Sequence, residues 1–111
     1  MVKIDTRNIG TFREEDFSKT LLYQSSRTRV LLLCFEPGQE MPPHHCSFEI
    51  VWYILEGEGV FTMDGKEQLC AKQSLIVTPS HTTRGFRADG RTRMLLFLPR
   101  IQGIPITASP N

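Results

Sequence analysis

One stretch of the sequence decides the fold: PGQEMPPHHC at residues 37–46, followed by the apolar run FEIVWYIL at residues 48–55 and by Gly57. The proline and glycine that open this stretch are turn residues, and Gly57 ends the apolar run, so the run has the length and the boundaries of a β-strand. Two histidines and a cysteine, at positions 44–46, stand just before it. Imidazole and thiolate groups are common ligands of zinc, iron, copper and nickel, so the stretch also raises the hypothesis of a metal site.

Short strand-like runs, each closed by turn residues, recur along the rest of the chain, and no convincing helical period interrupts them. The Asp64-Gly65 pair is a strong signal for a two-residue hairpin, because both residues tolerate the positive φ that such a turn needs. Roughly eight strands at a spacing of about ten residues indicate an antiparallel sandwich or barrel. The strands are predicted at residues 19–25, 29–36, 48–55, 60–63, 67–70, 74–78, 83–87 and 93–98.

The chain has 111 residues, which is enough for one domain with a core of its own. Its formal net charge of +1 gives no general attraction to nucleic acid, and no apolar run is long enough to cross a bilayer. The segment from Met1 to Asp16 is polar rather than a charged-then-apolar leader, so we expect a cytoplasmic protein. Of the three cysteines, Cys34 and Cys70 sit in apolar runs and are expected to be buried thiols.

Two of the predicted strands, Leu31 to Phe35 and Met94 to Leu98, are apolar on both faces. A strand in a lone sandwich alternates, because one of its faces meets water. We therefore expect one face to fill the barrel and the other to meet a second copy of the chain in a homodimer. The barrel domain is predicted at residues 19–101, between an N-terminal arm (1–18) and a C-terminal tail (102–111) that either pack on the partner or fray.

The spacing of several residues resembles the two sequence motifs of the cupin superfamily. The first motif of that family runs glycine, five residues, His, one residue, His, three or four residues, Glu, six residues, glycine; the matching positions here are Gly38, His44, Cys46, Ile50 and Gly57. The second runs glycine, five residues, Pro, one residue, glycine, two residues, His, three residues, Asn; the matching positions are Gln73, Pro79, His81, Arg84 and Ala88. The resemblance covers about residues 29–98 and implies an all-β, antiparallel jelly-roll barrel in a single domain.

The resemblance also implies a metal site held by three histidines and one glutamate, and this chain departs from that set. Only His44 is retained, and Cys46 could replace a second ligand as a thiolate. Ile50 stands at the position of the glutamate and cannot bind a metal. Arg84 stands at the position of the third histidine, where its permanent positive charge would repel a metal ion.

Arg84 supports a different function. The frame of the resemblance places Arg84 inside the barrel with Phe86, opposite Trp52. A buried guanidinium needs a partner, and the carboxylate or phosphate of a ligand suits its planar fork. We therefore predict a protein that binds a small, anionic organic molecule, either as a binding or sensing module or as a metal-independent enzyme. The predicted ligand-binding residues are His44, Cys46, Ile50, Trp52, Arg84 and Phe86. The other interpretation of Arg84 is a solvated basic hairpin that it forms with Arg87, Arg91 and Arg93.

The alternative function is a metal-dependent enzyme of the oxygenase or isomerase type. Iron, nickel, zinc, copper or manganese would bind to His44 and Cys46, completed by His45 or His81. His45 would replace His44 if a β-bulge shifted the strand by one residue. The strand that follows is apolar at both parities, so the pattern leaves open which of the two histidines faces the cavity.

Overall fold

The computed structural model describes residues 1–100, which contain nine β-strands and no helix. Every strand predicted from the sequence is present, with ends that differ by one or two residues, and one further strand was not predicted. The strands are β1 (Ser18–Gln24), β2 (Thr28–Phe35), β3 (Glu40–Cys46), β4 (Ile50–Glu56), β5 (Glu58–Met63), β6 (Lys66–Ala71), β7 (Leu75–Thr78), β8 (Thr82–Ala88) and β9 (Thr92–Pro99). The all-β fold class is thus confirmed. No helix able to cross a membrane occurs in this part of the chain.

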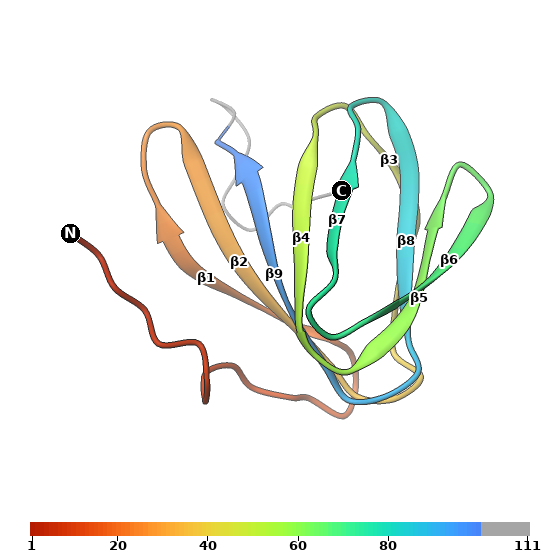
Figure 1. Cartoon of the computed structure of the whole chain (residues 1–111), viewed down its shortest axis with the longest axis horizontal. Coiled ribbons are helices and arrows are strands. Elements are labelled where there is room, and N and C mark those ends of the chain that lie inside the picture. Colours follow the sequence, from red (N-terminus) through yellow and green to blue (C-terminus); the bar gives the residue numbers. More distant parts are fainter. Residues whose placement is uncertain (101–111) are drawn as a thin grey trace.

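The strands form two antiparallel sheets that face each other across the core (Figure 1). One sheet has five strands in the order β1-β2-β9-β4-β7, and the other has four in the order β3-β8-β5-β6. The chain crosses repeatedly between the sheets, which is the arrangement of a jelly roll and confirms the predicted single barrel. Cavities lie where the sheet edges meet, one between β6 and β7 and one between β1 and β3. The barrel is therefore open along two sides.

Two tight turns depend on residues that accept a positive φ. Asp64 (φ 49°) and Gly65 (φ 82°) form the predicted hairpin, and the residues on either side of them, Met63 and Lys66, pair directly. Gly57 (φ 89°) carries the chain from β4 into β5, in the opposite sheet. A Cβ at this position would collide with the backbone of β9 and its preceding turn, so the crossing requires glycine.

β3 is the strand that the sequence did not predict, because prolines at positions 42–43 argue against a strand interior. The strand lies at the edge of its sheet and pairs with β8 alone, so the missing N–H groups leave the rest of the ladder intact. Its register shifts between Met41 and His44, which marks a β-bulge. The bulge places Met41, His44 and Cys46 on the inner face and leaves His45 exposed on the outer face.

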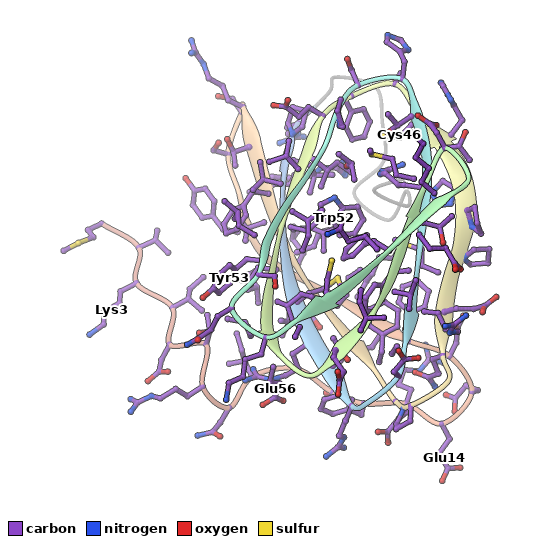
Figure 2. All side chains as sticks on the ribbon, turned by 45° about the vertical axis from the view of Figure 1, so that its right-hand side comes forward. Lys3, Glu14, Cys46, Trp52, Tyr53 and Glu56 are labelled. Carbon is purple, nitrogen blue, oxygen red and sulfur yellow. The ribbon has the colours of Figure 1, made fainter. Side chains whose placement is uncertain are left out.

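The core fills the space between the sheets with alternate residues of each strand. Trp52 stands at its centre and points into the barrel (Figure 2). Its indole Nε1 donates a hydrogen bond to Thr78 Oγ1 at 2.9 Å, and its ring meets Phe61 edge-on with the ring centroids 5.2 Å apart. Because the buried indole has a hydrogen-bond partner, its burial carries little polar cost.

Within the N-terminal segment (residues 1–17), residues 6–10 pack on the outer face of the five-stranded sheet, whereas Phe17 stacks on Phe35 in the core. The guanidinium of Arg93 donates hydrogen bonds to main-chain oxygens within residues 6–9 at 2.6–3.2 Å. Gly10, which follows these residues, lies against Leu32 and Cys34, both of which are fully buried. The chain's own N-terminal segment therefore covers the second apolar face of β2, so the burial of that face needs no second copy. The reason given above for a homodimer is thus wrong for β2, whereas the outer face of β9 remains partly exposed at Phe97.

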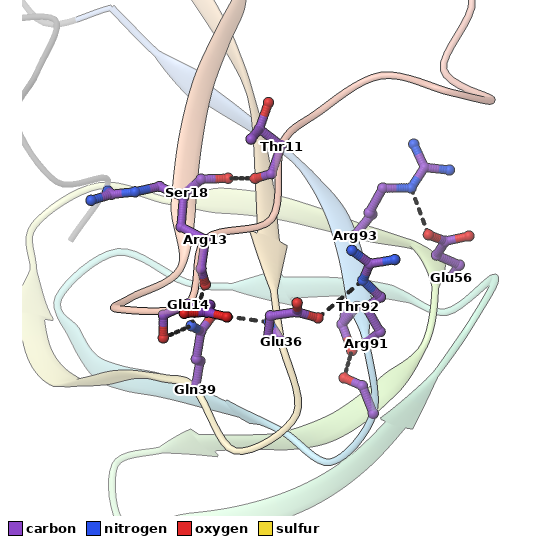
Figure 3. A network of polar contacts seen from close by, with 11 residues as sticks. Thr11, Arg13, Glu14, Ser18, Glu36, Gln39, Glu56, Arg91, Thr92 and Arg93 are labelled. Carbon is purple, nitrogen blue, oxygen red and sulfur yellow. Dashed lines mark hydrogen bonds and ion pairs between the residues drawn. The ribbon is translucent and has the colours of Figure 1, made fainter.

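A second set of contacts holds the same segment at the turn between β2 and β3 (Figure 3). Gln39 Nε2 donates to the main-chain oxygens of Arg13 at 2.7 Å and Glu14 at 3.2 Å. Ser18 donates to the main-chain oxygen of Thr11, just before β1 begins. The barrel was predicted to begin at residue 19, and β1 begins at Ser18. The predicted tail, residues 102–111, lies outside the described residues.

Candidate functional site

Four residues form a row across the inner face of the four-stranded sheet. Met63 on β5 pairs with Lys66 on β6 and with Arg84 on β8, and Arg84 pairs in turn with His44 on β3. Residues that pair directly across antiparallel strands point to the same face and contact each other. We call these four residues the basic row. It runs from the open side at β6 to the open side at β3, and Arg84 lies in its interior.

Arg84 is fully buried, and its guanidinium carbon lies 5.6 Å from the centroid of the Trp52 ring. Cys46 lies beside the guanidinium. Burial lowers the pKa of Arg84 from its ordinary value, and Cys46 opposes that change. Arg84 is thus an interior residue, and its interpretation as part of a solvated hairpin is wrong. Arg87 and Arg91 are the exposed members of that group of four arginines.

His44 lies at the β3 end of the basic row. Its Nδ1 is 2.9 Å from the carbonyl oxygen of Pro42, which can only accept, so Nδ1 carries the proton. In the neutral ring Nε2 is then an acceptor, and this atom is buried without a hydrogen-bond partner among residues 1–100. Burial lowers the pKa of His44, and the charges of Arg84 and Lys19 add to that effect against the opposing bond to Pro42. The structure therefore presents a neutral imidazole with an unused lone pair inside the barrel.

The inner face of the barrel is strongly basic. The strand registers place Lys19, Arg29, Lys66 and Arg84 at inward-facing positions, and no inward-facing position of the nine described strands is Asp or Glu. Burial lowers the pKa of Lys19, and the charge of Arg29 lowers it further. Repulsion between cations accounts for that second effect.

The structure brings the six predicted ligand-binding residues together on the inner side of the barrel. They come in pairs from three strands, His44 and Cys46 from β3, Ile50 and Trp52 from β4, and Arg84 and Phe86 from β8. Apart from His44, each is at most 3% exposed. The six side chains expected to bind a ligand are therefore packed against one another, and we call them the packed cluster. Open space is found beside this cluster.

The predicted metal ligands are divided between the two faces of the sheet. His44 and Cys46 face inward, whereas His45 and His81 are exposed with their rings 6.1 Å apart. His81 occupies the turn before β8 with a φ of 59°, and it does not reach the interior. Residues 1–100 contain no group of three His, Cys, Asp or Glu side chains placed to hold a metal. The β-bulge in β3 thus selects His44 rather than His45 as the inward residue.

Two cavities flank the packed cluster. One, of about 460 Å³, lies between the edge strands β6 and β7, and we call it the β6–β7 slot. It is lined by Phe61, Met63, Lys66, Glu67, Gln68, Leu69, Cys70, Ser74, Leu75, Ile76, Val77 and Thr78. The other, of about 630 Å³, lies between β1 and β3 and has charges of both signs, from Lys19 and Asp16 among others. Sequence reasoning missed Lys66 and Met63, although their places on either side of the Asp64-Gly65 hairpin predict that they pair.

The chain is similar to several known proteins. A family model described as "Cupin domain" matches residues 31–98. The structure of TT1209 from Thermus thermophilus has a TM-score of 0.83 and 26% identity, covering 91% of this chain and all of that one. An RmlC-like cupin protein from Desulfovibrio desulfuricans has a TM-score of 0.81 and 25% identity, covering 89% and 96% of the two chains. Salicylate 1,2-dioxygenase from Pseudoaminobacter salicylatoxidans shares the fold, with a TM-score of 0.70 and 16% identity over 76% of this chain and 26% of that one. The comparison with curated proteins gave no match.

Proposed function

Because the chain belongs to the cupin family, we propose that its barrel binds a small organic anion and that Arg84 holds the anionic group. The family alone does not define a function, so the proposal depends on the site. One observation carries it: a fully buried arginine lies on the inner face of the barrel beside an aromatic ring, that of Trp52.

Burial of a positive charge is expensive unless other groups compensate for it. The Trp52 ring and Cys46 lie beside the Arg84 guanidinium. The planar fork of a guanidinium binds a carboxylate or phosphate oxyanion through two parallel hydrogen bonds, so Arg84 suits the anionic group of a ligand. The inward-facing Lys19 and Lys66 would raise the local concentration of such an anion at the two open sides.

His44 and Cys46 complete the proposed binding site on β3. His44 offers a hydrogen-bond acceptor at Nε2, so it suits a hydroxyl or amide group of the ligand rather than its anionic group. Trp52 and Phe86 supply apolar surface beside Arg84. This combination of one cation, one acceptor and aromatic surface is typical of a small-molecule binding module. Binding is the activity we propose; a metal-independent reaction would need a nucleophile or base in contact with the bound molecule.

The test is thermal unfolding of the protein with a panel of small carboxylates and phosphorylated sugars, and with neutral sugars for comparison. A compound that binds only the folded state raises the melting temperature with its concentration. The shift is expected in the wild type and in the matched control Arg87→Met, an exposed arginine on the same strand. It is expected to disappear in Arg84→Met. A panel without any shift, or an equal shift in Arg84→Met, would overturn the proposal.

A metal-dependent enzyme is the second candidate, and it is favoured by Nε2 of His44, which is buried without a hydrogen-bond partner in the described part of the chain. The surrounding residues do not fit the family's metal centre, because no group of three His, Cys, Asp or Glu side chains within residues 1–100 is placed to hold a metal and Arg84 lies directly opposite His44. Tight sites for transition metals usually have at least three protein ligands. Elemental analysis of protein purified without a histidine tag decides between the candidates. Near-stoichiometric iron, nickel, zinc, copper or manganese that is lost in His44→Ala would reverse their order.

A further inference from the structure

The β6–β7 slot is the feature that the proposed function leaves unexplained. Its volume of about 460 Å³ falls within the range of small-molecule sites, roughly 300–1,000 Å³. It lies where two sheet edges meet, so the lining comes from β5, β6 and β7 and from none of the loops at the far end of the barrel. Figure 2 shows Trp52 in the interior of the barrel, between the two sheets.

The floor of the slot is apolar and continuous with the packed cluster. Phe61 lies at this floor and contacts Trp52 and Phe86, with ring centroids 5.2 Å and 4.8 Å apart. Met63 and Ile76 line the slot beside it. Aromatic and thioether groups of this kind favour a flat apolar body over a sugar or a free inorganic anion.

The rim of the slot is basic on its inner side. Alternation along β6 turns Lys66, Gln68 and Cys70 inward, whereas Glu67 lines the slot from its outer side. Within the basic row, Met63 alone separates Lys66 from Arg84, because it pairs with both. Met63 is 36% exposed and has a flexible side chain, so a ligand group can take its place more easily than that of a buried residue.

We propose that the β6–β7 slot holds the body of the bound molecule and that this molecule is a monocarboxylic acid with a flat apolar body. The acid group lies between Lys66 and Arg84 at the position of Met63, and the body lies on Phe61 and Ile76. This inference rests on the proposed function, since it names the class of anion and the part of the barrel that receives it. Lys66 is then the second residue that holds the carboxylate.

Benzoate is the probe, and benzyl alcohol and acetate are its comparisons. Benzyl alcohol keeps the aromatic body without the charge, and acetate keeps the charge without the body. We expect benzoate to bind more tightly than either compound, as measured by titration calorimetry. Lys66→Met is expected to weaken benzoate binding about fivefold, the effect of losing a partly exposed ion pair. Lys72→Met is the matched control, because Lys72 lies in the turn after β6 and does not line the slot.

Cys70 gives a second readout that does not depend on any substitution. It lines the slot and is partly exposed, whereas Cys34 and Cys46 are buried, so a thiol reagent should modify it first. Burial raises the pKa of the Cys70 thiol, so the reaction is followed at alkaline pH. Benzoate at ten times its dissociation constant is expected to slow the alkylation of Cys70 about tenfold.

The outcomes separate this inference from the proposed function. If acetate binds as tightly as benzoate and Arg84→Met alone abolishes binding, the proposed function stands and the slot inference is wrong. If benzoate protects Cys70 and needs Lys66 but binds equally well to Arg84→Met, the slot is the site and the role of Arg84 is wrong. Binding of benzoate without protection of Cys70, or no binding at all, also contradicts the slot inference.

Discussion

His44 and Arg84 lie directly opposite each other on β3 and β8, so an imidazole and a guanidinium share the inner face of one sheet. Two positive charges on directly paired residues repel each other strongly where little water surrounds them. The pair therefore tolerates only one charge, and that charge belongs to Arg84. This relationship links the pH dependence of stability to the candidate site.

The first prediction concerns acid stability. The folded state lowers the pKa of His44 below its ordinary value of 6.5, chiefly by burial and then by the charges of Arg84 and Lys19. Between that lowered pKa and 6.5 the unfolded chain binds more protons at this residue than the folded chain does. The free energy of unfolding is therefore expected to fall as the pH drops below about 6.5. Urea unfolding between pH 5 and 8 measures this, and His44→Gln should flatten the slope.

The matched control for this measurement is His45→Gln, since His45 is exposed on the outer face of the same strand. The free energy of unfolding of His45→Gln is expected to change with pH as steeply as that of the wild type. Equal slopes for wild type and His44→Gln would show that the imidazole is not held neutral in the interior.

The second prediction concerns the hydrogen bond at the centre of the core. Thr78→Val removes the acceptor of the Trp52 indole and leaves a buried N–H without a partner. Such a group costs about 1–3 kcal/mol of stability. Trp52 is the single tryptophan of the chain, so its fluorescence reports unfolding directly. Thr20→Val, on an exposed edge-strand position, should change stability by less than about 0.5 kcal/mol. Equal losses in the two variants would refute the importance of the indole bond.

The third prediction concerns the N-terminal segment. Arg93→Met removes the hydrogen bonds to residues 6–9 and should expose Cys34 on the outer face. Loss of even one hydrogen bond to a charged group is expected to raise the rate of Cys34 alkylation roughly tenfold. Arg87→Met serves as the control, because its ion pair with Asp89 is exposed and distant from the segment. An unchanged rate in Arg93→Met would mean that other contacts hold the segment in place.

The fourth prediction concerns assembly. The outer face of the five-stranded sheet remains apolar beyond the N-terminal segment, where Val51 pairs with both Val77 and Phe97. Val77 is 49% exposed and Leu75 is 65% exposed. We propose that this face binds a second copy of the chain, because large exposed apolar patches commonly mark interfaces between proteins. Sedimentation at several concentrations should show a dimer that Val77→Lys converts to a monomer.

Leu69→Lys is the control for the dimer, because Leu69 is 71% exposed and belongs to β6, in the other sheet. A wild-type protein that sediments as a monomer at all concentrations would end the dimer proposal. So would a dimer that survives Val77→Lys and dissociates with Leu69→Lys.

Most of the strands could be predicted because each is a short apolar run between turn residues, which is local information. β3 escaped prediction for a tertiary reason: its prolines are tolerated only because the strand lies at a sheet edge. The packed cluster around Arg84 could be anticipated from the spacing of the two motifs. The slot could not, because β6 and β7 meet only when the two sheets face each other.

The sequence by itself determined most of the strands and the Asp64-Gly65 hairpin, and its resemblance to the cupin motifs implied the jelly-roll barrel with Arg84 in its interior. Turn chemistry and strand spacing act over a few residues, so they can be read without coordinates. Only the tertiary structure decided that His44 faces inward. The one extra residue at the β-bulge in β3 turns the residues that follow it to the opposite face of the sheet. The tertiary structure alone also aligned Arg84 with Met63 and Lys66, since β8 comes from a more distant part of the chain than the hairpin of β5 and β6.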